Sequence, residues 1–458
     1  MRVFGCLLGL CGLFLAHGAD FLIRNVTVVD VKTGGELSKS SVWIHNGQIA
    51  AVGERTGAPA VAAVVNGAGK YLIPGLWDMH VHLWYREHQF PLFLANGVTG
   101  VRDMGSDLNW VNHWRDEIKA GKLLGPRIHT CGPPVDGQPS GDAKLPVLVV
   151  HTPNDARATF DRLDNMDVDF VKVLSNVPRD AYFALIERAR KWYIPVAGHV
   201  PESVSLMEAI DARQKSVEHM TGVLLACSKH EDNLRKRVLL ALEAKDVRSY
   251  EKIDTEILRS FDAKKAGELF ERMARFETRE VPTLIMLRRE MFPDTKDALA
   301  SPHLKYISAS IRKTWSNSGE TEDPMPESTR ALLAAEYTKL SELLLQMKRA
   351  GVKIMAGTDT GDPYTFPGYD LHRELELLVS AGLTPLDALR SATIEPAEYL
   401  GAEESIGTIQ KGMAADLVLL DADPLADIRN TQKIDGVFVD GKYLSKARLV
   451  AMLGSGAR

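Results

Sequence analysis

The chain has 458 residues, of which 45% are hydrophobic and 25% are charged, an average composition for a soluble globular protein. Its 55 lysines and arginines stand against 60 aspartates and glutamates, which gives a net charge of -5 without long runs of one sign. This balance argues against a nucleic-acid partner. The length allows one large domain and a smaller one.

The first 19 residues are typical of a secretory signal peptide. Arg2 precedes an apolar run over residues 3–15, and the small residues that follow suit a signal-peptidase site. We therefore expect export, to the periplasm or outside the cell, with an uncleaved anchor as the alternative. No later segment is apolar enough to predict a membrane span. Cys131 and Cys227, the two cysteines outside the leader, could form one disulfide, but a domain of this size does not require it.

Short β-strands are predicted near both ends of the chain. Residues 21–29 and 42–52 form apolar runs, with the hairpin pair Asn46-Gly47 inside the second. Residues 416–420 and 436–444 return to the same pattern. We expect residues 20–70 and 405–446 to meet as a small β-sandwich.

Between these ends, eight apolar runs alternate with helical segments, a pattern that indicates an α/β fold with a parallel (β/α)8 barrel over residues 71–404. The predicted strands cover 71–82, 98–102, 127–130, 170–174, 194–197, 216–218, 281–287 and 353–356, and the clearest helices cover 181–192, 204–212, 330–350 and 384–400. Two intervals are long. Residues 224–280 are predicted as additional helices, and residues 288–329 follow the seventh strand, where they could cover the mouth of the barrel.

The first strand ends in His80-Val81-His82. In an extended chain, residues two apart lie on one face, so both imidazoles can reach one metal ion. A buried strand with two hydrogen-bonded histidines is the alternative interpretation, and it would be favoured for an isolated pair.

One lysine, Lys172, lies inside the apolar fourth strand. Its ordinary explanation is an inward lysine that pairs with a carboxylate. The functional alternative is an amine, deprotonated by burial, that takes up carbon dioxide and becomes an anionic metal ligand.

Three more polar residues follow the ends of predicted strands: His199, His219 and Asp359. Each alone has an ordinary explanation, a satisfied structural histidine or, for Asp359, a helix N-cap. Together with His80, His82 and Lys172 they occupy the carboxyl ends of strands one, four, five, six and eight, where barrel active sites form.

With these residues the chain resembles the amidohydrolase superfamily, in its subgroup with two metals bridged by a carboxylated lysine, which includes prolidase-like and imidazolonepropionase-like proteins. Further motifs that carry the resemblance are residues 74–78, 97–103, 384–389, 407–409 and 412–418.

The resemblance implies that His80, His82 and Asp359 hold the more buried ion, that His199 and His219 hold the second, and that carboxylated Lys172 bridges them. Zinc is the expected ion, with manganese, cobalt and iron as alternatives. A hydroxide shared by the ions would attack a small-molecule substrate and cleave a C–N bond, and Asp359 would carry the proton to the leaving amine.

Several alternatives remain open from the sequence. The chain has Cys131-Gly132-Pro133 and His199-Val200-Pro201 where dipeptidases of this group often carry other segments, which puts Xaa-Pro dipeptidase activity in doubt. A lactonase or esterase and a metal-free scaffold are further alternatives. Lys172 argues against a true imidazolonepropionase, which uses one metal. A homo-oligomer is compatible with the sequence.

Candidates for contact with substrate are less certain, because each has an ordinary surface or packing role as its alternative. They are Arg102, His129, Arg288, Tyr364 and His372.

Overall fold

The structure is a computed structural model that describes residues 20–455, with gaps at 142–143, 293–299 and 317–324. The predicted signal peptide, residues 1–19, lies outside the described residues, as do two parts of the interval 288–329 that we expected at the barrel mouth. Within the described ranges, no helix combines the length and the apolar character needed to cross a membrane.

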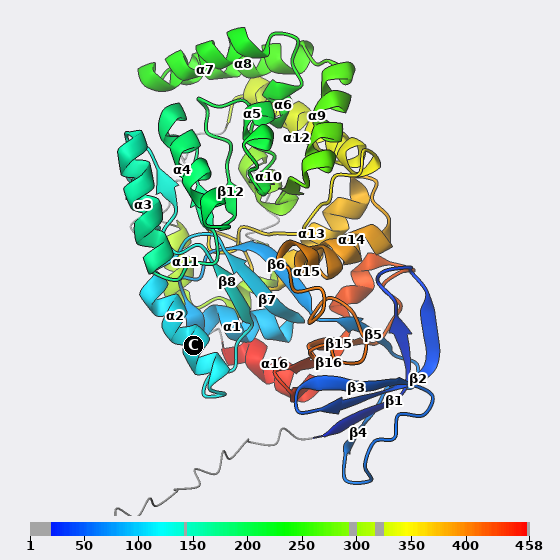
Figure 1. The fold of residues 1–458 in the computed structure, drawn as a ribbon. Coiled ribbons are helices and arrows are strands. Elements are labelled where there is room, and N and C mark those ends of the chain that lie inside the picture. Colours follow the sequence, from blue (N-terminus) through cyan, green and yellow to red (C-terminus); the bar gives the residue numbers. More distant parts are fainter. Residues whose placement is uncertain (1–19, 142–143, 293–299, 317–324, 456–458) are drawn as a thin grey trace, which may run out of the picture.

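Both ends of the chain join one eight-stranded sheet, at the lower right of Figure 1. Its strands are β1 (Phe21–Val29), β2 (Glu36–His45), β3 (Gln48–Gly53), β4 (Ala63–Asn66), β5 (Tyr71–Pro74), β15 (Leu417–Leu420), β16 (Ile434–Val439) and β17 (Lys442–Ser445). They are hydrogen-bonded in the order β17-β16-β15-β5-β1-β2-β3, and β4 pairs with β1. The sheet curls around its own apolar core, because the ring of Phe21 on β1 lies 5.6 Å from that of Phe438 on β16, three strands away.

The middle of the chain contributes parallel strands in a sheet of three and a sheet of six. They are β6 (Leu76–Val81), β7 (Val98–Asp103), β8 (Arg127–Thr130), then β9 (Val135–Asp136), β10 (Leu148–Val149), β11 (Val171–Val173), β12 (Val196–Gly198), β13 (Ser216–Glu218) and β14 (Arg279–Val281). Backbone hydrogen bonds link the two sheets on both sides. The amide of Asp169 donates to the carbonyl of Thr130 over 2.9 Å, and residues 354–356 bridge β14 and β6 through Met355 N to Glu280 O and Met79 N to Ala356 O, each 2.9 Å.

Helices surround these strands, and α7 and α8 lie at the end of the molecule opposite the terminal sheet (Figure 1). The first group is α1 (Arg86–Ala95), α2 (Leu108–Lys119), α3 (Pro153–Asn165), α4 (Arg179–Lys191), α5 (Leu206–Asp211), α6 (Val223–Ala226), α7 (Glu231–Ala244), α8 (Val247–Arg259) and α9 (Ala263–Phe276). The second is α10 (Leu284–Met291), α11 (Ala309–Ser316), α12 (Glu327–Arg349), α13 (Tyr369–Ser380), α14 (Pro385–Ser391), α15 (Ile394–Tyr399) and α16 (Lys446–Ser455), with 3-10 turns at Pro302–Tyr306 and Ile428–Gln432. Capping boxes mark the N-termini of several helices. Thr152 and Asp155 form one at α3, and Thr384 and Asp387 form one at α14.

Three strand predictions need correction. The run over 353–356 forms no strand, only a bridge of Ile354 with Glu280. The run over 71–82 is two strands, because β5 pairs with β1 and β15 in the terminal sheet whereas β6 pairs with β7. The run over 281–287 is a strand only as far as Val281. Thr283 then adopts a left-handed backbone (φ 44°), and residues from Leu284 form helix α10. Short apolar runs do not distinguish a buried strand from a buried helix.

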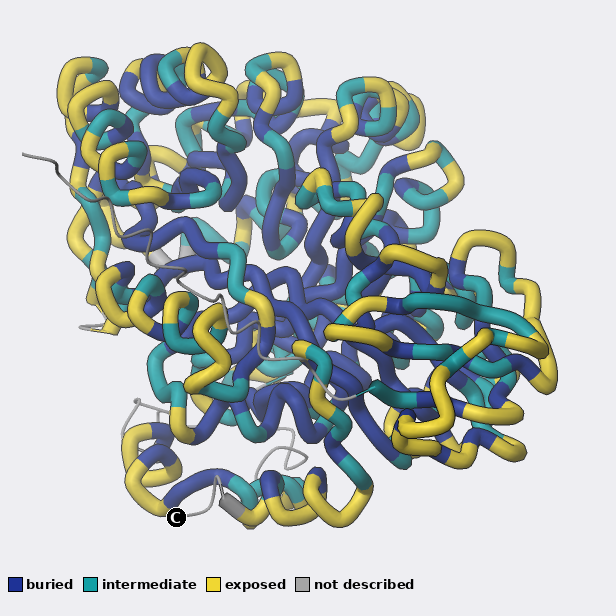
Figure 2. Tube along the Cα trace, turned by 60° about the horizontal axis from the view of Figure 1, so that its bottom comes forward, coloured by how far each residue is buried: buried dark blue, intermediate teal, exposed yellow. Residues whose placement is uncertain are grey.

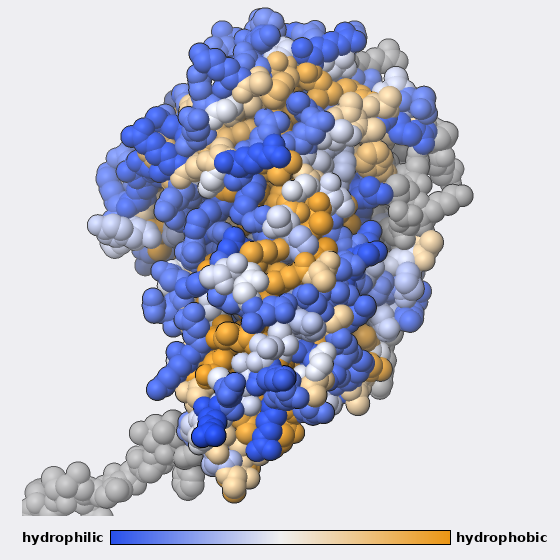
Figure 3. Space-filling model, turned by 90° about the vertical axis from the view of Figure 1, so that its right-hand side faces the viewer, coloured by the Kyte–Doolittle hydropathy of each residue, from blue (hydrophilic) through white to orange (hydrophobic). Residues whose placement is uncertain are grey.

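Burial follows this architecture. Figure 2 shows buried residues concentrated along the central strands and exposed residues on the outer helices and loops. On the face drawn in Figure 3, hydrophilic side chains break the apolar surface into smaller groups. Cys131 and Cys227 are both buried and free, so they form no disulfide with each other.

Candidate metal centre

Six polar side chains meet at the carboxyl ends of the parallel strands. They are His80, His82, Lys172, His199, His219 and Asp359, the six that the sequence singled out. Four are buried, and His199 and His219 are half-buried. The strands therefore bring together residues that lie up to 279 positions apart in the chain (359 - 80).

Asp359 lies between the imidazoles. Its Oδ1 is 3.3 Å from Nε2 of both His80 and His82, and its Oδ2 is 3.8 Å from Nε2 of His219. The ring centroid of His199 lies 5.1 Å from that of His219, and Nζ of Lys172 lies 3.3 Å from Nε2 of His80. All six side chains are therefore connected through direct contacts.

The backbone is strained where it presents these side chains. His219 and Asp359 have φ angles of 60° and 58°, in the left-handed region that non-glycine residues rarely adopt, and the neighbouring Thr283 has 44°. The backbone also passes close to His80 at Gly357, where an added Cβ atom would lie 2.8 Å from Cβ of His80. The segment 357–359 can pass beside His80 only because residue 357 lacks a side chain.

Each imidazole has a hydrogen-bond partner at Nδ1. His80 contacts Oε2 of Glu218 (3.0 Å), and His82 contacts the carbonyl of Gly105 (2.7 Å). His199 contacts the hydroxyl of Ser175 (2.8 Å), and His219 that of Thr283 (2.7 Å). Such outer partners are typical of metal-ligating histidines, because they orient the ring and leave the other nitrogen for the ion.

The pKa values reflect a dry, crowded site. Burial lowers the pKa of His219 to about 4 and places those of His80 and His199 well below the ordinary range, with Lys172 adding to each effect. Burial by itself would raise the pKa of Asp359, but the nearby His82, His219 and Lys172 lower it overall. Neutral imidazoles beside an ionised carboxylate are the forms that bind a divalent cation.

Lys172 has no carboxylate close enough for an ion pair in the part of the chain that the structure describes. Its side chain is 2% exposed, and its only hydrogen-bond contact is His80. The ordinary explanation, an inward lysine neutralised by a carboxylate, is therefore not what the structure contains. A buried ammonium in this position costs free energy unless another group compensates it.

The residues present fit a divalent ion. His80, His82 and Asp359 offer ligand atoms that all lie within 4.8 Å of one another. Oδ1 of Asp359 is buried without a hydrogen-bond partner, although buried polar atoms nearly always have one. Two nitrogens and a carboxylate oxygen that converge on an unsatisfied point are the donor set of zinc.

The candidates for substrate contact are scattered. Tyr364 follows Asp359 by five residues, and its ring lies 5.3 Å from that of Trp315 on α11. His129 stacks on Phe170 at 5.3 Å inside the strands. Arg288 lies on α10 and lines a cavity of about 350 Å³ with Arg289 and Arg373 among its other lining residues.

Two candidates have clear structural roles instead. Arg102 is fully buried and donates to the carbonyl of Met79, to Ser216, to Tyr399 and to both carboxylate oxygens of Glu218, so no part of its guanidinium is left for a substrate. We correct its role to support of the ligand His80 through Glu218. His372 is buried between the hydroxyl of Thr431 and the carbonyl of Asn96 and likewise holds elements together.

The sequence did not single out several residues that support the ligands. Asp78 is fully buried and accepts from the amide of His80 and from the amide and hydroxyl of Thr358, which ties β6 to the segment before Asp359. Burial raises the pKa of Asp78 to about 7. Glu218, inside a three-residue strand next to His219, carried a detectable signal, because acidic residues are rarely buried without a role.

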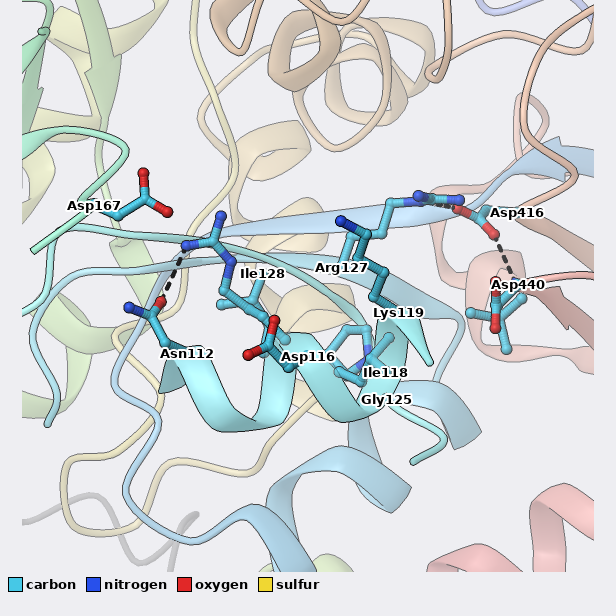
Figure 4. A pocket seen from close by; sticks show the side chains of 13 residues that line it. Asn112, Asp116, Ile118, Lys119, Gly125, Arg127, Ile128, Asp167, Asp416 and Asp440 are labelled. Carbon is cyan, nitrogen blue, oxygen red and sulfur yellow. Dashed lines mark hydrogen bonds and ion pairs between the residues drawn. The ribbon is translucent and has the colours of Figure 1, made fainter. Parts of the chain in front are cut away.

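A larger cavity, of about 570 Å³, lies away from this centre (Figure 4). It is lined by α2, the start of β8 and the terminal sheet. It contains an ion pair: Nε of Arg127 lies 2.5 Å from Asp416, which also accepts from the amide of Asp440. Size alone therefore does not identify the functional site in this protein.

Known proteins resemble the chain in sequence and in fold. The model of the amidohydrolase family matches residues 311–444. The imidazolonepropionase of Acinetobacter baumannii (strain AB307-0294) is 29% identical over 136 residues, 29% of this chain and 32% of that protein, so the match spans about a third of the relative.

Among solved structures, bottromycin amidohydrolase superposes with a TM-score of 0.74 at 22% identity, covering 95% of this chain and 90% of that one. A Xaa-Pro dipeptidase with bound methionine has a TM-score of 0.66 at 22% identity and covers 93% of this chain and all of the other. At this identity the structural matches establish the fold. The family match over residues 311–444 and the imidazolonepropionase relative support membership of the amidohydrolase superfamily.

Proposed function

We propose that this protein is a metal-dependent hydrolase that cleaves an amide or peptide-like C–N bond of a small molecule. The observation that carries the proposal is the convergence of His80, His82 and Asp359 on a point where a buried carboxylate oxygen has no partner. The family match and the imidazolonepropionase relative support the same reaction class.

The proposed centre holds two ions, most simply zinc, with His80, His82 and Asp359 around one and His199 and His219 around the other. Lys172, as its carbamate, would bridge them. Support for the carbamate is the buried amine, which has no carboxylate partner among the described residues. Bound divalent ions would ionise a water near neutral pH and polarise the substrate carbonyl.

Asp359 is the proposed proton carrier. Its carboxylate lies at the centre of the site, beside the position that a metal-bound water would take. The proton would then pass to the leaving amine as the C–N bond breaks.

The finer architecture belongs to the same proposal. The hydrogen bonds that link the two parallel sheets support a closed (β/α)8 barrel over 71–404, and the curled terminal sheet supports a β-sandwich of 20–70 and 405–446. Export and a homo-oligomer stay predictions from the sequence. A dipeptidase of the Xaa-Pro type and a lactonase or esterase remain the alternative activities.

The test is a metal analysis followed by a substrate screen. Purified protein should contain close to two divalent ions per chain, and the zinc-loaded protein should hydrolyse N-acyl amino acids or dipeptides faster than lactones or phosphotriesters. A metal-free protein would favour a scaffold of the same fold. Metal without hydrolysis of any of the four classes would contradict the proposed activity.

A further inference from the structure

The two halves of the candidate centre differ in how their imidazoles are held. We propose that they bind metal in sequence: the half with His80, His82 and Asp359 binds first and tightly, and the half with His199 and His219 binds second and more weakly. In this proposal Ser175 and Thr283 are positioning residues of the second half. The inference rests on the proposed function, in that the centre takes up two ions.

In the first half, the partner at each Nδ1 can only accept a hydrogen bond. Nδ1 of His82 faces the carbonyl of Gly105, and Nδ1 of His80 faces a carboxylate oxygen of Glu218. Because a carbonyl and a carboxylate have no proton to give, Nδ1 of each ring must carry it. The lone pair of each neutral ring is then on Nε2, the atom 3.3 Å from Asp359.

Glu218 is itself held in place by donors at both oxygens. Arg102 donates to both of its oxygens at 2.8 and 2.7 Å, and Ser216 donates to Oε1 at 2.5 Å. Arg102, Glu218 and His80 are all 0% exposed. The orientation and tautomer of His80 are therefore set before an ion arrives, so little free energy is spent on ordering this half.

In the second half, the partner at each Nδ1 is a hydroxyl: Ser175 for His199 and Thr283 for His219. A hydroxyl donates or accepts with equal ease, so either tautomer of these rings is satisfied. The second ion must select the tautomer with the lone pair on Nε2. The described group of three mutually close ligands includes neither ring.

The test is a stepwise titration of chelator-treated protein with Zn²⁺ in bicarbonate buffer, followed by calorimetry and by competition with a chromophoric chelator. For the unsubstituted chain we expect two separate steps, the first at least about 10-fold tighter. Glu218→Gln should weaken the first step by about 10- to 100-fold, because the amide cannot accept from both Arg102 and His80. Ser175→Ala and Thr283→Val should weaken the second step by about 10-fold and leave the first unchanged.

Matched controls separate positioning from general damage. Glu280→Gln changes an equally buried carboxylate on the next strand, whose Oε1 accepts from the amide of Met220 and contacts no imidazole. Thr278→Val removes a buried hydroxyl that donates to the carbonyl of Gln214. Both controls should keep both steps, and the thermal midpoint of each metal-free variant shows whether the fold is retained.

The outcomes distinguish this inference from the function on which it rests. Two equal steps in the unsubstituted chain, or a first step weakened by Ser175→Ala or Thr283→Val, would overturn sequential binding while two ions still bind. A chain that binds no Zn²⁺ would overturn the proposed function as well.

Discussion

The two ends of the parallel strands carry polar groups in opposite arrangements. At the amino ends, in the cavity of Figure 4, Arg127 and Asp416 form an ion pair at 2.5 Å. At the carboxyl ends, Asp359 keeps an unpaired oxygen, and Lys172 faces an imidazole instead of a carboxylate. Buried polar side chains normally have hydrogen-bond or ion-pair partners, because a missing partner lowers folding stability. Buried polar groups without such partners therefore point to a ligand.

The largest expected effect, on turnover, is at the carboxyl ends of the strands, where Asp359 lies. Asp359→Asn should lower turnover by about 100- to 10,000-fold, because an amide cannot accept and return the proton. Part of the metal should remain, since the amide oxygen still faces His80 and His82. Steady-state rates and metal content measured on the same preparation check both expectations.

Asp416→Asn supplies the matched control, an identical change of a buried carboxylate at the satisfied end. It should keep turnover within about twofold. Full activity of Asp359→Asn would remove the assignment of Asp359 as proton carrier.

A second change addresses Lys172. Lys172→Met keeps a long apolar stem but removes the amine, so the variant should lose one or both ions per chain. Without metal it should be more stable than the unsubstituted protein by about 1 kcal/mol or more, because a buried ammonium without a carboxylate has been replaced by an apolar group. Metal content and urea unfolding measure the two effects. Lower stability would mean that the ammonium has a compensating partner.

The sequence singled out the six candidate ligands because each lies within or directly after a short apolar run. Residues 127–130 and 216–218 are strands as predicted, and the run before His80 has the right direction although it divides at Gly75. Period-two patterns and the ends of strands are local properties, so one chain without coordinates is enough to find them.

The supporting residues could not be predicted in this way. Nothing local marks Ser175 or Thr283 as the partner of an imidazole, since hydroxyl residues near strand ends usually cap turns. Arg102 was one of several candidates for contact with substrate. The structure instead pairs it with Glu218, 116 residues away, a long-range contact without a sequence signature.

A pH series would separate the effect of burial from the effect of metal binding. Burial lowers the pKa of His372, which lies outside the metal centre, to about 4. The unfolded chain takes up this proton near pH 6.5, so between pH 6.5 and about 4 the unfolded state binds more protons and stability falls as the pH falls. The loss should reach about 3 kcal/mol for this residue.

Urea unfolding of metal-free protein at pH 7 and pH 4 measures this loss, and His372→Gln should show a smaller loss of stability on acidification. An equal loss in the variant would assign the acid sensitivity to other groups, the ligand histidines first.

The smallest effect is expected at the satisfied end. Asp416→Asn keeps an oxygen for the amide of Asp440 but loses the charge that faces Arg127. Because the Arg127 side chain is 45% exposed, solvent screens the pair, and the cost should be only about 1 kcal/mol. In 1 M salt the difference from the unsubstituted protein should shrink. Urea unfolding at low and high salt measures it, and a cost of several kcal/mol at both would mean that this end of the strands is as sensitive to a lost charge as the metal centre.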